Sequence, residues 1–117
     1  MSGRTPEETL EASVEAYNTH DLDAFLATYA PDARFCKLDG TVLLSDRNIM
    51  GGYYKQFFEQ SPNVRCEIPQ RAVMGPFVID HQRIVLDATA ETPRGMDAMV
   101  ISEVRDGFIV RCTYSPL

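Results

Sequence analysis

A histidine, an aspartate and an arginine in the C-terminal half are the residues best suited to chemistry in this chain. Asp80 and His81 are adjacent in a strand-like segment, residues 77–88, and Arg111 lies in the last such segment, residues 108–115. Histidine exchanges protons near neutral pH, and the arginine guanidinium binds carboxylates and similar anions. These residue types suggest acid–base chemistry on an anionic small molecule.

A metal site at Asp80 and His81 is not expected, although both residue types are common ligands. Adjacent side chains of a strand point to opposite faces, so these two cannot bind one ion together. Cys36, Cys66 and Cys112 are widely spaced and form no Cys-x-x-Cys pair, so neither a zinc site nor a redox dithiol is expected. The cysteines are instead expected to behave as small apolar residues, and the sequence implies no cofactor.

The composition is that of an acidic chain of 117 residues with a formal net charge of −6. This length favours a single domain over residues 1–117. The negative charge argues against nucleic acid, because phosphate binding needs clustered Lys and Arg, and it also disfavours an anionic membrane surface. No run approaches a membrane span and residues 1–9 are polar, so no secretion signal is predicted and a cytoplasmic location is expected.

The first helices have recognisable starts. Thr5-Pro6-Glu7-Glu8 combines a capping box with a proline at the first helical position, so a helix is predicted to begin there. Asp21 is the predicted cap of a second helix, which Pro31 ends. The apolar stripe of this second helix comprises Leu22, Phe25, Leu26 and Tyr29.

A hairpin and a third helix complete the first half. Asp39-Gly40 is a turn signal between strands at residues 35–38 and 41–44. Ser45 or Asp46 then caps the third helix. Its apolar stripe comprises Ile49, Met50, Tyr53, Tyr54, Phe57 and Phe58.

The second half predicts strands only. Four strand-like segments, residues 64–74, 77–88, 96–105 and 108–115, are separated by glycine-, proline- or aspartate-containing turns. Helices followed by a long run of strands indicate an α+β domain with an antiparallel sheet.

This order of elements resembles the nuclear transport factor 2-like superfamily, and within it the SnoaL-like and ketosteroid isomerase-like proteins. The motifs that carry the resemblance are Tyr17-Asn18, Asp21-Leu22-Asp23, Tyr29-Ala30-Pro31-Asp32 and Ile101-Ser102-Glu103-Val104-Arg105-Asp106-Gly107. The resemblance implies a cystatin-like roll, in which a curved antiparallel or mixed sheet forms a cone around a pocket covered by three N-terminal helices. Homodimers are common in that superfamily, whose members include isomerases, dehydratases, epoxide hydrolases, polyketide cyclases and proteins without catalysis.

The resemblance does not imply steroid isomerisation by the ketosteroid isomerase mechanism. The positions of that enzyme's catalytic tyrosine, general base and protonated aspartate fall on Val14, Lys37 and Ser102. Two supporting aromatic positions do match, at Tyr29 and Tyr54. They imply a pocket with hydroxyl donors deep inside.

The resemblance also anchors the faces of the strands. If Asp106-Gly107 forms a two-residue turn, Ser102 pairs with Arg111, and both face the pocket because Ser102 matches a pocket-lining position. The same alignment directs His81 and Arg83 inward. A bulge near residues 75–76 would instead bring Asp80 inward in place of His81.

These assignments predict a pocket that binds an anionic or polar-hydrophobic small molecule. Arg111 would orient the ligand, Tyr54 and Tyr29 would donate hydrogen bonds, and His81 would act as acid or base in an isomerase, lyase or cyclase step. The other expected lining residues are Lys37, Phe57, Arg83 and Ser102. The alternatives are a structural histidine and an internally paired arginine, in a non-catalytic binding or dimerisation module.

A homodimer follows from the opposite face of the sheet. That face is expected to carry Met99, Ile101, Glu103, Val110, Cys112 and Tyr114. Because a sheet that is apolar on both faces must be covered on both, and the helices cover only one, a second copy is predicted to cover the other.

Overall fold

The computed structural model describes residues 3–117 as an α+β fold with an open, six-stranded mixed sheet. The helices are α1 Pro6–Asn18, α2 Leu22–Leu26 and α3 Arg47–Gln60. The strands are β1 Tyr29–Lys37, β2 Val42–Leu44, β3 Arg65–Met74, β4 Phe77–Val85, β5 Gly95–Arg105 and β6 Phe108–Pro116. Their order is β2-β1-β6-β5-β4-β3, in which β1 and β6 are parallel and all other neighbours are antiparallel.

The helix starts agree with the sequence, and one helix end does not. The capping box at Thr5 and Glu8 is present, with the Thr5 hydroxyl accepting from the Glu8 N–H and the Glu8 carboxylate accepting from the Thr5 N–H. The second helix, however, ends at Leu26, so Tyr29 begins β1 instead of continuing that helix. The chain leaves the helix early because the carbonyl of Thr28 accepts a hydrogen bond from the Ile109 N–H, which ties this segment to β6.

A β-bulge in β6 overturns the expected pairing of Ser102 with Arg111. The turn at Asp106-Gly107 forms as predicted, with φ of 53° and 79°, which are values typical of a two-residue hairpin turn. Val104 then pairs with Ile109, but Glu103 pairs with Arg111, leaving Val110 as an extra residue. From this point the faces of β6 are reversed relative to the prediction, so Cys112 lies opposite Ser102 and Arg111 lies on the other face.

The predicted face of β4 is also wrong. Val78 pairs with Ser102 and Asp80 pairs with Val100, in a ladder without a break from Phe77 to Val85. Asp80 therefore shares the face of Ser102, whereas His81 and Arg83 lie on the opposite face. The alternative that brought Asp80 inward has the correct face, but no bulge in the β4–β5 pairing causes it.

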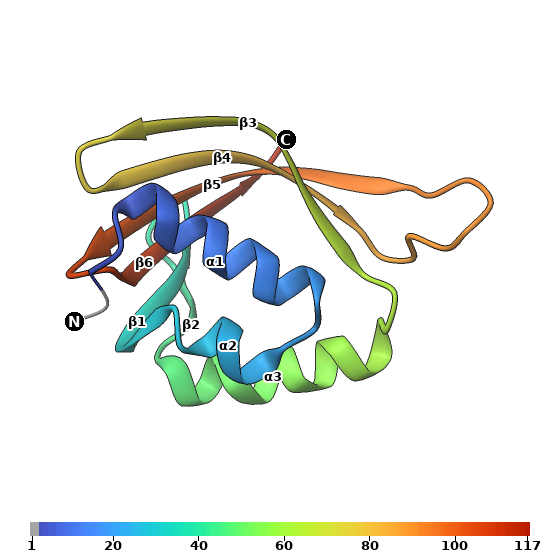
Figure 1. Cartoon of the computed structure of the whole chain (residues 1–117), viewed down its shortest axis with the longest axis horizontal. Coiled ribbons are helices and arrows are strands. Elements are labelled where there is room, and N and C mark those ends of the chain that lie inside the picture. The colour runs from blue at the N-terminus through green and yellow to red at the C-terminus, as the bar shows by residue number, and fades with distance from the viewer. Residues whose placement is uncertain (1–2) are drawn as a thin grey trace.

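The three helices lie against one face of the sheet and leave the other without helical cover (Figure 1). We call these the inner face and the outer face. Burial along β5 alternates strictly from Ala98 to Val104, with each even-numbered residue buried on the inner face. The helix α3 approaches α2 closely at Gly51, where a Cβ would lie 3.2 Å from Leu26 Cδ1, so the glycine allows close packing between these helices. Over residues 3–117, no helix is long and apolar enough to cross a membrane.

Candidate functional site

A two-part cavity lies between the helices and the inner face of the sheet. We call its parts the inner chamber, of about 50 Å³, and the outer chamber, of about 560 Å³. The residues that line both are Tyr17, Phe35, Tyr54, Gln82, Ile84 and Val100. The outer chamber opens past Leu43, Tyr53 and Met96, whose side chains are about half exposed. Its volume suits a drug-sized organic molecule.

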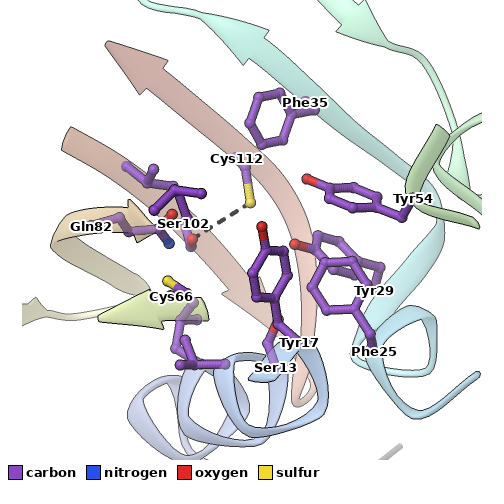
Figure 2. Close-up of a pocket in the computed structure, with 14 residues that line it drawn as sticks. Ser13, Tyr17, Phe25, Tyr29, Phe35, Tyr54, Cys66, Gln82, Ser102 and Cys112 are labelled. Carbon is purple, nitrogen blue, oxygen red and sulfur yellow. Dashed lines mark hydrogen bonds between the residues drawn. The ribbon is translucent and has the colours of Figure 1, made fainter. Parts of the chain in front are cut away.

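Three tyrosines from different elements meet in the inner chamber. Tyr17 comes from α1, Tyr29 from the start of β1 and Tyr54 from α3, and Figure 2 shows their hydroxyls directed toward the same region near Cys112. Phe25 holds two of them by edge-to-face contacts, with ring centroids 5.2 Å from Tyr29 and 4.8 Å from Tyr54. This packing holds the phenol rings of Tyr29 and Tyr54 in place.

The phenols are donors, not bases, over the physiological pH range. Burial raises the pKa of Tyr29 and of Tyr54 well above the ordinary value, and it raises the pKa of Tyr17 as well. A protonated phenol offers an O–H to an acceptor on a ligand. Tyr54 lines both chambers, and Figure 2 shows its hydroxyl directed into the cavity.

Ser102 and two thiols complete the polar part of the inner chamber. The Ser102 hydroxyl lies 3.5 Å from Cys112 Sγ, as the dashed line in Figure 2 marks. Burial raises the pKa of Cys112 to about 11 and that of Cys66 to about 12. Both groups are therefore neutral thiols near pH 7 and are not activated nucleophiles.

The structure separates the predicted site residues into two groups. Tyr29, Tyr54 and Ser102 line the inner chamber, and Phe57 lines the outer chamber. The predicted residues that lie away from the cavity are Lys37, Asp80, His81, Arg83 and Arg111. The expected combination of arginine, histidine and tyrosines in one pocket is therefore wrong in geometry.

The predicted basic residues of β4 form a cluster on the outer face. His81 Nε2 lies 2.7 Å from Asp97 Oδ1, and Arg83 Nε donates to the same oxygen at 3.1 Å. The hydrogen bonds from Arg83 and His81 lower the pKa of Asp97. Gly95 leaves room for this arrangement, because a Cβ there would lie 2.6 Å from Arg83 Cδ.

Asp80 lies on the inner face but is not free to act on a ligand. Its side chain is only 1% exposed and accepts two hydrogen bonds from Arg71, at 2.6 and 2.9 Å. This bidentate pair supplies the compensation that a buried carboxylate needs. Over residues 3–117, no group of three or more His, Cys, Asp or Glu side chains is placed to hold a metal ion.

Sequence reasoning missed Tyr17, Cys112 and Gln82 as lining residues. Tyr17 carried a usable signal, because it lies at helical spacing from Leu10 on the same apolar stripe. Gln82 would have followed from correct pairing of the strands, since it lies on the face of Ser102. Cys112 could not be found from alternation alone, because the bulge at Val110 shifts it inward.

The curved sheet, its helical cover and the cavity between them define a cystatin-like, nuclear transport factor 2-like fold. An uncharacterised cystatin-fold protein of Novosphingobium aromaticivorans is similar at a TM-score of 0.85 and 21% identity, over 97% of this chain and 99% of that one. IdmH of Streptomyces antibioticus, a proposed polyketide cyclase, is similar at 0.77 and 22%, over 97% and 92%. AclR of Streptomyces galilaeus, a proposed hydroxylase, is similar at 0.77 and 14%, over 96% and 88%. At these identities the comparisons show the fold alone.

The family is defined by the sequence. Residues 10–112 match the SnoaL-like domain, so the chain belongs to the SnoaL-like domain family. A comparison with curated proteins finds no match. The resemblance read from the sequence is thereby confirmed, whereas the fold and family assign no particular reaction.

Proposed function

We propose that this protein binds a neutral, largely apolar small molecule that carries a carbonyl oxygen. The observation that supports the proposal is the cavity lining, which is aromatic and aliphatic with uncharged polar groups at its inner end. Asp97, the charged residue among the described lining residues, is already paired with Arg83 and His81. An anionic ligand would lose its hydration without gaining a cationic partner, so a neutral ligand fits better than the anionic one expected from sequence.

The tyrosines suggest how the ligand is oriented. A carbonyl oxygen in the inner chamber would accept hydrogen bonds from Tyr54 and Tyr17, while the apolar body of the ligand would fill the outer chamber. The same donors would stabilise an enolate if the protein catalyses a cyclase, isomerase or lyase step. That IdmH is described as a proposed polyketide cyclase is in keeping with such a step. Binding without turnover is the alternative.

A matched pair of ligands tests the proposal. Thermal shift and calorimetry would compare 2-acetonaphthone, which is neutral, with 2-naphthoate, which has the same ring system and a carboxylate. We expect stabilisation by the ketone and much weaker or no stabilisation by the carboxylate. A preference for 2-naphthoate would contradict the proposal. Turnover is tested separately, by following proton exchange at the methyl group of the bound ketone, which an enolising enzyme would accelerate.

We also propose that a second copy of this chain covers the outer face. Ile79, Met99 and Ile101 form a partly exposed apolar row there, and no helix packs over this face. The flanking residues carry both signs of charge, as Arg111 and Glu103 illustrate, which suits a two-fold interface. Analytical ultracentrifugation should show a dimer at micromolar concentration and a monomer for Ile101→Lys. A wild-type monomer under the same conditions would refute this.

A further inference from the structure

We propose that Gln82 is a specificity-determining residue that selects ligands with a hydrogen-bond donor and an acceptor side by side, such as a primary amide or a lactam. This inference rests on the proposed function, because it concerns the same cavity. It adds a second polar subsite, away from the tyrosines, and it narrows the ligand class from carbonyl compounds in general to those with an adjacent donor.

The position of Gln82 is the first support. Gln82 lies on the inner face of β4 and lines both chambers, and in Figure 2 its side chain enters the cavity from the side opposite Tyr54 and Tyr29. Its partner across the β4–β5 pair is Ala98, a small side chain that leaves the amide uncovered. A ligand that reaches from the outer chamber to the tyrosines therefore passes Gln82.

The second support is that the amide is unused. Among residues 3–117, no hydrogen bond or ion pair involves the side chain of Gln82, although this side chain is half-buried. The other polar groups of the inner face are engaged: Asp80 with Arg71, and Ser102 with Cys112. A half-buried amide with two donors and an accepting oxygen but no protein partner is available to a ligand.

A second amide in the same molecule shows the pairing that Gln82 could offer. Asn18 donates from Nδ2 to the carbonyl of Cys66 at 2.9 Å, and its Oδ1 accepts from the N–H of Cys66 at 2.7 Å. One planar amide thus satisfies an adjacent donor and acceptor at the same time. Gln82 presents the same chemistry toward open space, so its natural complement is a ligand edge with the same two functions.

The test compares two neutral probes that differ only in the donor. 2-Naphthamide and 2-acetonaphthone share the ring and the carbonyl, but only the amide carries an N–H. Calorimetry on wild type and Gln82→Met should show a loss of about five- to ten-fold in affinity for 2-naphthamide, as for one neutral hydrogen bond or slightly more. The affinity for 2-acetonaphthone should fall clearly less, since the ketone can accept from Nε2 of Gln82 but offers no donor to the amide oxygen.

Controls separate this inference from the proposed function and from misfolding. Gln70→Met makes the same change at an exposed position paired with His81, and it should leave both affinities as in wild type. Gln82→Asn keeps an amide but shortens the side chain by one methylene, which draws the amide back from the cavity. This variant should fold as wild type and lose the preference for 2-naphthamide over 2-acetonaphthone. If Gln82→Met weakens both probes equally or neither, Gln82 is not selective and the proposed function stands. If wild type binds neither probe, both proposals fail.

Discussion

The two faces of the sheet differ in where their charged side chains lie. On the inner face, the buried carboxylate of Asp80 is paired with Arg71, and the inner chamber is lined by neutral groups. On the outer face, His81, Arg83 and Asp97 form an open cluster at partial exposure. The same strand, β4, contributes to both by simple alternation. The predicted histidine and arginines therefore lie outside the cavity, whose inner chamber is lined by uncharged polar groups and apolar side chains.

The largest effect is expected from breaking the buried ion pair. Asp80→Ala should lower the free energy of unfolding by about 3 kcal/mol, because Arg71 would lose its partner in a largely buried site. Urea denaturation at pH 7 would measure this. The matched control is Glu103→Ala, which removes the partner of the 71% exposed Arg105 and should cost about 0.5 kcal/mol. Equal losses would mean that the inner pair gains nothing from burial.

The loss of stability at alkaline pH should come from other groups than the loss at acid pH. Burial raises the pKa of Cys112 to about 11 and of Cys66 to about 12, from an ordinary value of 9.0. Above pH 9 the unfolded chain loses these protons while the folded chain keeps them, so stability should fall as pH rises from about 9 toward 11. Denaturation at pH 8, 9 and 10 should show this decline, and Cys112→Ala should make it shallower.

The decline of stability at low pH should instead include a contribution from Asp97 on the outer face. The lowered pKa of Asp97 means that its contribution is present above the ordinary value of 3.8 and is lost as pH falls below it. Asp97→Asn should therefore make the acid side of the stability profile less steep and leave the alkaline side unchanged, while the lowered pKa values of Glu8, Asp39 and Asp87 keep part of the acid slope. A change on the alkaline side alone would contradict this division between the faces.

Removing one phenolic hydroxyl should weaken ligand binding without unfolding the protein. Tyr54→Phe should reduce the affinity for 2-acetonaphthone by about five-fold, which corresponds to one neutral hydrogen bond. Arg111→Ala, on the outer face, should leave the affinity for this ketone and for 2-naphthoate unchanged. Calorimetry would settle both, and a specific loss of 2-naphthoate binding in Arg111→Ala would restore arginine as a ligand contact.

The smallest effect is expected at Gly95. In Gly95→Ala the new methyl group would displace the Arg83 side chain that packs on the glycine. The ion pair with Asp97 should be lost, with a small fall in melting temperature, because the groups are exposed and screened. Ligand affinity should be unaffected. A fall in ligand affinity would show that the outer-face cluster is coupled to the cavity.

The sequence predicted local features well and long-range pairing only partly. The capping box at Thr5 and the turn at Asp106-Gly107 follow from local hydrogen-bonding rules, and the structure has both. The predictions of which sheet face each side chain occupies were wrong where one irregularity in the pairing sets the faces of many residues. The extra residue Val110 reverses every face after it, and the pairing of Asp80 with Arg71 depends on a contact between strands that no local rule supplies.

The bulge at Val110 has a consequence for how reliably the chain folds. Without the extra residue in its unpaired position, the remainder of β6 would slip by one residue, and Arg111 would enter the cavity in place of Cys112. An unpaired guanidinium among phenols and aliphatic side chains would be costly, so the slipped pairing is strongly disfavoured. Arg111 thus favours the observed register of β6. The slipped register would bury its charge in the cavity, whereas the observed register leaves its side chain exposed.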